Sequence, residues 1–258
     1  MKKYFLIFMI TILTGTIFAQ REHFSKEVFK IGDKEIPYRF SKPQGYDPFS
    51  PQKYPVILFL HGAGERGNDN EIQLTHIDKV FGTEAFRQKY PCFVIVPQCP
   101  AEKRWVDVDW NLPSHSQPKE MSEPMKLAIS VLYSVILNYR IDSQRVYIVG
   151  LSMGGYGTWD LIARFPELFA AAVPICGGGD ENTASKIKHI PIWAFHGAKD
   201  KAVPVARSRN MINAIKEAGG NPKYSEYPEL GHLVWDTAFS SSELWEWLFL
   251  QVRKTVNK

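Results

Sequence analysis

The sequence predicts an α/β protein whose central sheet is mostly parallel. Short apolar runs recur along the chain, helical patterns alternate with them, and each run is followed closely by glycine or proline. Runs that are apolar on both faces suit strands that lie buried between two layers of helices. Alternation of strands and helices produces βαβ units, which build a parallel sheet with helices on both of its faces.

The first expected element is a hairpin. Glu27 to Ile31 and Glu35 to Phe40 flank the turn residues Gly32-Asp33, so we expect two antiparallel strands at the edge of the sheet. The buried strands expected after this hairpin are 56–60, 93–96, 146–149, 171–175 and 192–195, followed by a short run at 224–227.

The expected helices lie between these strands. Residues 123–138 place apolar side chains near a period of 3.6 residues, which is typical of an amphipathic helix. The other helical segments are 154–165, 205–218 before Gly219-Gly220, and 242–252 after a run of capping serines. No repeat or linker separates these segments, so residues 20–258 are expected to form a single domain.

Residues 1–19 differ from the rest of the chain and are expected to be a signal peptide. Lys2 and Lys3 precede a mostly apolar run that ends at Phe18, and Ala19 follows, which is the order of a secretory leader. The run of about 15 residues is shorter than the roughly 20 that a bilayer requires. An uncleaved anchor is the alternative. We expect a secreted or periplasmic protein without stable membrane insertion after cleavage.

The composition excludes several other classes of protein. Hydrophobic residues make up 45% and charged residues 22% of the 258 residues, unlike a disordered or fibrous chain. The formal net charge is +4, and removal of the two leader lysines lowers it to +2. A charge this small gives no reason to expect a nucleic-acid partner.

The three cysteines give no sign of a metal site. Their odd number leaves at least one thiol unpaired. We favour three buried free thiols at Cys92, Cys99 and Cys176, with a bridge between the first two as the alternative. The histidines are not spaced with them as zinc ligands would be, so no metal is expected.

Gly150-Leu151-Ser152-Met153-Gly154 matches the G-x-S-x-G pattern between an expected strand and an expected helix. A serine hydroxyl is a weak nucleophile and must be exposed within reach of a base. A sharp turn exposes it, and the helix N-terminus brings N–H groups close to developing negative charge. We therefore predict that Ser152 is a nucleophile. The alternative is a serine that only caps the helix.

This arrangement requires an acid and then a histidine further along the chain. Asp200 and His232 each follow an expected strand, where sites in open α/β sheets lie. A buried carboxylate fixes the tautomer of the imidazole and stabilises the imidazolium, and we assign these roles to Asp200 and His232. Asp180 is the alternative acid, whereas Asp236 follows the histidine and so breaks the expected order. His196, at the end of a strand, is interpreted as a structural hydrogen-bonding residue.

Two backbone N–H groups are expected to form an oxyanion hole. Met153 directly follows the nucleophile, and Ala63 lies in the glycine-rich loop His61–Gly67 after an early strand, with Gly64 as the next choice. A glycine-rich loop can also bind phosphate. However, this one matches neither the G-x-G-x-x-G pattern nor a P-loop.

These motifs together resemble those of secreted bacterial α/β-hydrolases, namely carboxylesterases grouped with feruloyl esterases, polyhydroxybutyrate depolymerases and prolyl oligopeptidase-type hydrolases. The resemblance runs from about Tyr54 to the C-terminus. It rests on His61-Gly-Ala-Gly-Glu-Arg-Gly67, Val96-Pro-Gln-Cys-Pro100 with Trp105, Gly150-Leu-Ser-Met-Gly-Gly-Tyr-Gly157, Phe195-His-Gly-Ala-Lys-Asp200, and Gly231-His232 followed by Trp235.

The resemblance implies an α/β-hydrolase fold. It also implies ester hydrolysis through an acyl-enzyme by a catalytic triad of Ser152, Asp200 and His232, without a metal or an organic cofactor. It does not fix the substrate.

The loop at 99–122 is the expected source of specificity. Trp105 in this loop, and Trp235 after the histidine, are candidate substrate-binding residues, although packing is the more frequent role of a tryptophan. Export, low charge and aromatic loops favour a small-molecule or oligosaccharide ester, such as an acyl or feruloyl ester of a polysaccharide fragment. A serine peptidase of the prolyl oligopeptidase type and a non-catalytic binding module are the alternatives.

Overall fold

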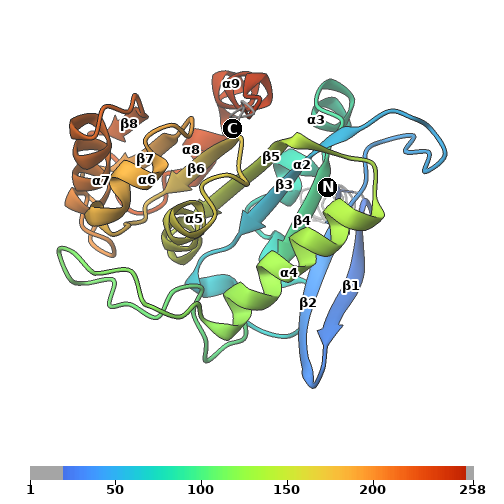
Figure 1. The fold of residues 1–258 in the computed structure, drawn as a ribbon, viewed down its shortest axis with the longest axis horizontal. Coiled ribbons are helices and arrows are strands. Elements are labelled where there is room, and N and C mark those ends of the chain that lie inside the picture. Colours follow the sequence, from blue (N-terminus) through green and yellow to red (C-terminus); the bar gives the residue numbers. More distant parts are fainter. Residues whose placement is uncertain (1–19, 254–258) are drawn as a thin grey trace, which may run out of the picture.

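A computed structural model describes residues 20–253, so the expected signal peptide at 1–19 lies outside the described residues. One sheet of eight strands has the order β1-β2-β4-β3-β5-β6-β7-β8. The expected hairpin is present as β1 (Phe24–Ile31) and β2 (Lys34–Ser41), which pair antiparallel at one end of the sheet (Figure 1). β2 also pairs antiparallel with β4, and the remaining pairs are parallel. The predicted fold class is confirmed.

The parallel strands agree closely with the apolar runs. They are β3 (Tyr54–Leu60), β4 (Phe93–Pro97), β5 (Ile141–Leu151), β6 (Ala171–Ile175), β7 (Trp193–Gly197) and β8 (Lys223–Tyr227). β3, β4, β6 and β7 are buried along their whole length. β5 begins earlier than its apolar run, because the polar residues 142–145, which are at least partly exposed, separate the buried Ile141 from that run.

Alternate side chains of each strand pack into two cores, one on each face of the sheet. On β3, Val56 and Leu58 belong to one core and Ile57 and Phe59 to the other. The first face is covered by α4 (Glu123–Asn138), α5 (Met153–Arg164), α6 (Ala184–Ile187) and α7 (Ala206–Glu217). The second face is covered by α2 (Asp78–Phe81), α3 (Glu84–Lys89), α8 (Trp235–Ser240) and α9 (Ser242–Leu250).

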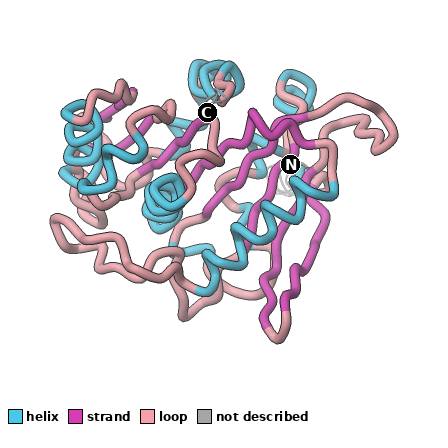
Figure 2. The backbone as a smooth tube through the Cα atoms, viewed as in Figure 1, coloured by secondary structure: helices cyan, strands magenta, loops and turns pink. Residues whose placement is uncertain are grey.

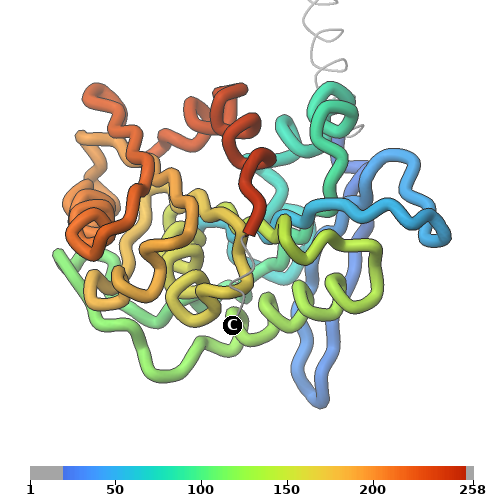
Figure 3. Tube along the Cα trace, turned by 45° about the horizontal axis from the view of Figure 1, so that its top comes forward, coloured from blue at the N-terminus to red at the C-terminus, as the bar shows by residue number. Residues whose placement is uncertain are grey.

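The segment between β4 and α4 is a long connection without helix or strand, drawn as loop in Figure 2. In Figures 1 and 3 this green segment runs from the end of β4 toward α7 before it returns to α4. Ser122 caps the start of α4, and its hydroxyl accepts a hydrogen bond from the Met125 N–H at 3.3 Å. Within residues 20–253, no helix combines the length and the apolar character that crossing a bilayer demands.

The three cysteines are free and buried, which excludes a bridge between Cys92 and Cys99. Burial raises the pKa of each of these two thiols to about 12, because a thiolate is poorly solvated inside the protein. Both side chains therefore remain protonated at neutral pH and act as small hydrophobic groups.

Gly154 sets how closely α5 approaches the end of β3. A Cβ at this position would lie 1.9 Å from the Leu60 carbonyl oxygen and 2.8 Å from that of His61. We expect Gly154→Ala to lower the free energy of unfolding by about 3 kcal/mol or more, measured by urea titration. Gly64, where a Cβ would meet nothing within 4 Å, is the control, and equal losses in both variants would contradict the argument.

Candidate active site

Ser152 lies at a sharp turn between β5 and α5. Its φ of 53° and ψ of −117° are values that residues other than glycine rarely adopt. The turn is held by the Ser152 N–H, which donates to the Ile175 carbonyl at 2.8 Å, and by the Ser152 carbonyl, which accepts from the Tyr156 N–H at 3.1 Å. Its hydroxyl makes no helix-capping hydrogen bond, which argues against the alternative that this serine only caps the helix. The side chain is free to face a base.

The structure brings Ser152, His232 and Asp200 together. His232 Nε2 lies 2.8 Å from Ser152 Oγ, and His232 Nδ1 lies 2.7 Å from Asp200 Oδ2. Because Nδ1 faces a carboxylate it carries the proton, which leaves Nε2 to accept from the serine hydroxyl. The alternative acid, Asp180, instead accepts from the Gln117 N–H at 2.8 Å and from the short helix that follows it.

Asp200 is a buried carboxylate with donors on both oxygens. Oδ1 accepts from the N–H groups of Ala202 at 2.8 Å and Val203 at 2.9 Å, and Oδ2 accepts from His232 and, at 3.1 Å, from His196. Burial by itself would raise the pKa of Asp200. The hydrogen bonds from His196, His232 and Val203 outweigh this effect and hold the pKa well below its usual range. The carboxylate is therefore ionised at neutral pH.

This lowered pKa has a consequence for stability. A carboxyl group whose pKa is lower in the folded state stabilises the fold above its unfolded pKa of about 3.9, and this contribution is lost as the pH falls further. We expect the loss of unfolding free energy in Asp200→Asn to be constant from about pH 7 to pH 5 and to shrink below about pH 4. Urea titrations across this range measure it. A loss that stays the same at pH 3 would contradict the assignment.

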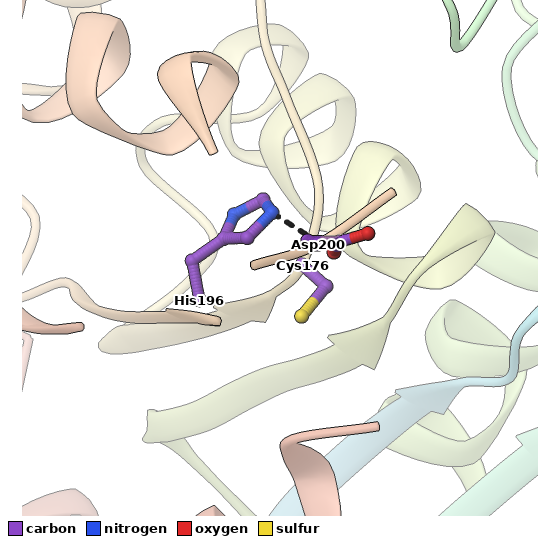
Figure 4. Close-up of side chains that lie close together, drawn as sticks. All are labelled: Cys176, His196 and Asp200. Atoms are coloured by element: carbon purple, nitrogen blue, oxygen red, sulfur yellow. Dashed lines mark ion pairs between the residues drawn. The ribbon is translucent and has the colours of Figure 1, made fainter. Parts of the chain in front are cut away.

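His196 lies beside the carboxylate, and a dashed line joins the two residues in Figure 4. It is fully buried at the end of β7, and its Nε2 faces Asp200 Oδ2 and the Val203 carbonyl, each at 3.1 Å. Its Nδ1 lies 2.7 Å from the Ser208 hydroxyl on α7. These are the contacts of a structural hydrogen-bonding residue, as the sequence suggested. The bond to Asp200 is an addition that the sequence did not indicate.

Figure 4 also shows Cys176 beside this pair. Ligand-type atoms of Cys176, His196 and Asp200 lie within 4.8 Å of one another, a spacing that a metal ion could bridge. However, both carboxylate oxygens and both ring nitrogens already take part in hydrogen bonds, and burial raises the pKa of the Cys176 thiol above its ordinary value. The cluster holds Asp200 in place and offers no free ligand set.

The loop expected to complete the oxyanion hole passes beside Ser152. A Cβ on Gly62 would lie 3.6 Å from the Ser152 Cβ, and Ala63 begins the 3-10 helix that follows. On the other side, Met153 is the first residue of α5, where N–H groups have no acceptor within the helix. Ala63 and Met153 therefore lie on the two backbone segments that flank the hydroxyl.

His61 supports this loop from below, which was not predicted from the sequence. His61 is fully buried, its Nδ1 donates to the Gly62 carbonyl at 2.6 Å, and its Nε2 accepts from the Cys99 N–H at 2.9 Å. Burial lowers the pKa of His61 to about 4, so the ring is neutral and can make both bonds. The signals available were the position of His61 at the end of a buried strand and its place in the motif His61–Gly67, and neither indicated these two bonds.

The substrate-binding role predicted for Trp105 is wrong. Its side chain is 0% exposed, and its Nε1 donates to the His61 carbonyl at 3.0 Å, so it supports the loop from inside and offers no surface to a ligand. Trp235 is 5% exposed and lies edge-on to the His232 imidazole with ring centroids 5.3 Å apart. Its indole also packs against the His76 ring, again with centroids 5.3 Å apart, and these contacts hold the His232 imidazole in position.

In this α/β protein a serine at a strained turn, an imidazole and a buried carboxylate form one hydrogen-bonded series. This is the arrangement of a serine hydrolase. The family model described as phospholipase/carboxylesterase matches residues 49–243, and the chain belongs to this family. The crystal structure of a thermostable esterase aligns with a TM-score of 0.81 and 40% identity, covering 90% of this chain and 64% of that one. The expected class, a serine carboxylic ester hydrolase, is confirmed.

Two curated relatives agree with this class. A probable carboxylesterase, SOBER1-like, from Arabidopsis thaliana is 26% identical over 205 residues, which is 73% of this chain and 76% of the relative. A poly(3-hydroxyoctanoate) depolymerase from Pseudomonas fluorescens is 30% identical over 195 residues, 67% of this chain and 65% of the relative. The chain thus spans somewhat less than two thirds of the depolymerase and of the thermostable esterase.

Proposed function

We propose that this protein is a secreted serine carboxylesterase that cleaves its substrate through an acyl-enzyme. The observation that carries the proposal is the series of hydrogen bonds from Ser152 Oγ to His232 Nε2 at 2.8 Å and from His232 Nδ1 to Asp200 at 2.7 Å. Ser152 is the nucleophile, His232 the general base and Asp200 the group that fixes the tautomer of the imidazole.

The reaction follows from this order of groups. Ser152 Oγ attacks the ester carbonyl carbon while its proton passes to His232 Nε2, and Asp200 stabilises the imidazolium that forms. The imidazolium then gives this proton to the leaving alcohol as the ester C–O bond breaks. Water attacks the acyl-enzyme with the help of the same ring, and the acid is released. The N–H groups of Met153 and Ala63 stabilise the oxyanion in both halves of the reaction.

The proposed substrate is an acyl or feruloyl ester of a polysaccharide fragment, reached outside the cytosol. The two lysines and the apolar run within residues 1–19 support export. An uncharacterized secreted protein of Arthroderma benhamiae, 29% identical over 221 residues with 22% of its length covered, is consistent with it. With Trp105 buried, the half-buried Trp110 is the tryptophan of the long loop that retains surface for a ring of the substrate.

A comparison of ester and amide substrates tests the proposal. The wild-type protein is expected to hydrolyse p-nitrophenyl acetate and acetylated or feruloylated oligosaccharides, and to react with a fluorophosphonate probe at Ser152. Ser152→Ala is the matched inactive control. Faster cleavage of p-nitroanilide peptides than of esters would favour a peptidase. Absence of both turnover and labelling would favour a binding module.

A further inference from the structure

Arg207, in the first turn of α7, is a buried cation without an acid to neutralise it. The residue is 0% exposed, and no carboxylate forms an ion pair with it within the described part of the chain. Its Nε and Nη1 atoms find no hydrogen-bond partner among residues 20–253. A cation in this place also meets the positive end of the α7 dipole. Burial of an unpaired charge disfavours folding, so stability does not explain this arginine.

The surroundings of Arg207 form a cradle for its guanidinium group. A Cβ on Gly178 would lie 2.4 Å from Nε, so the side chain fits only because glycine follows β6 here. The guanidinium carbon lies 5.5 Å from the centre of the Tyr156 ring, which is 1% exposed. Such a cation–π contact orients the group without neutralising it. The Tyr156 N–H donates to the Ser152 carbonyl, so the cradle lies one turn of α5 from the nucleophile.

The remaining wall comes from the long loop between β4 and α4. His115 Nδ1 is hydrogen-bonded to Arg207 Nη2, and the residues before it in the loop are exposed. Burial and the charge of Arg207 lower the pKa of His115 to about 4 against the opposing charge of Asp180, so at neutral pH the ring is an uncharged acceptor. His115 thus occupies one donor of the guanidinium with a neutral group, on a segment that has no regular secondary structure to fix it.

We propose that Arg207, Tyr156 and His115 form an anion subsite that binds a carboxylate group of the ester substrate. A carboxylate that replaces His115 at Nη2 also reaches the unpaired Nη1, and two parallel N–H···O bonds of this kind are the preferred geometry of arginine with carboxylates. Entry requires His115 to move outward with its loop. The inference rests on the proposed esterase function, because it assigns an acidic group to the substrate that Ser152 attacks.

Matched pairs of esters test the subsite by kinetics. If the acid lies in the acyl part, the wild-type protein is expected to prefer p-nitrophenyl hemiglutarate over p-nitrophenyl butyrate. If it lies in the alcohol part, the protein is expected to prefer 3-carboxyphenyl acetate over phenyl acetate. Arg207→Gln should lower the ratio of kcat/KM values for the preferred pair by about 10- to 100-fold, mainly through KM. Arg209→Gln is the matched control. Arg209 lies on the same helix, but it is exposed and paired with Glu226.

A binding measurement separates failure of the subsite from failure of the esterase. Glutarate is expected to raise the Tm of wild-type protein and of Ser152→Ala, but not of Arg207→Gln, while neutral glutaramide raises none of them. Glutarate should also inhibit wild-type hydrolysis of phenyl acetate competitively, which needs no folded variant. If esters are cleaved but neither pair is discriminated and glutarate neither binds nor inhibits, the subsite is overturned. If no ester is cleaved but glutarate binds through Arg207, only the esterase assignment fails.

Discussion

Ser152→Ala is expected to lower kcat for p-nitrophenyl acetate by about 10⁵-fold or more, because the attacking oxygen is removed and the remaining groups cannot act without it. The residual rate should come from binding and from the oxyanion donors alone. Stopped assays with high enzyme concentration measure it, and fluorophosphonate labelling should disappear in parallel.

The matched control is Ser130→Ala on the exposed side of α4, where the hydroxyl donates to the Lys126 carbonyl at 2.8 Å. This variant should keep its kcat and its labelling. A Ser152→Ala protein that retains more than about 1% of the wild-type kcat would mean that another group is the nucleophile. A further variant, Ser152→Gly, should be inactive but more stable by about 1 kcal/mol, because glycine adopts a φ of 53° without strain.

Asp200→Asn is expected to lower kcat by about 10⁴-fold while KM changes little, because an amide in place of the carboxylate favours the wrong tautomer of His232. In the native site the Nδ1 of His232 donates to Asp200 Oδ2 at 2.7 Å. An amide NH₂ in this position would instead donate to Nδ1. The proton would then lie on Nε2, which could no longer accept from Ser152.

Asp33→Asn, in the exposed turn between β1 and β2, makes the same chemical change far from the site and should leave kcat unaltered. Steady-state kinetics at pH 8 compare the two variants. A loss of kcat of less than about tenfold in Asp200→Asn would mean that Asp200 does not orient the imidazole, and it would favour Asp180 as the acid.

The sheet was predictable because its signals are local. Strands buried on both faces are mostly apolar, so β3, β4 and β6 stood out as uninterrupted runs, and β7 did so up to His196. Short helices such as α2, α6 and α8 span only four to six residues and show too little periodicity to be recognised. The meeting of Ser152, Asp200 and His232 could be anticipated because parallel strands bring their carboxyl ends to one edge.

Contacts that depend on side-chain packing could not be anticipated in this way. Trp105 looked like a loop residue available to a ligand, yet the chain folds it under the His61 carbonyl. Arg207 and His115 are 92 positions apart and belong to no shared motif. Whether a tryptophan is covered, or an arginine lacks an acid, depends on what distant segments place around it. The pattern of residues near each one does not contain that information.

The position of β1 and β8 at the two ends of the sheet bears on how the chain avoids aggregation. An outermost strand leaves unpaired N–H and C=O groups that invite another polypeptide to join, and ionic side chains discourage this. β1 carries Lys26 and Lys30, which pair with Glu71 and Glu35, and on β8 Lys223 pairs with Glu243. Addition of a foreign strand at either margin would bury these charges. These charged edges therefore disfavour fibre-like self-association at high concentration.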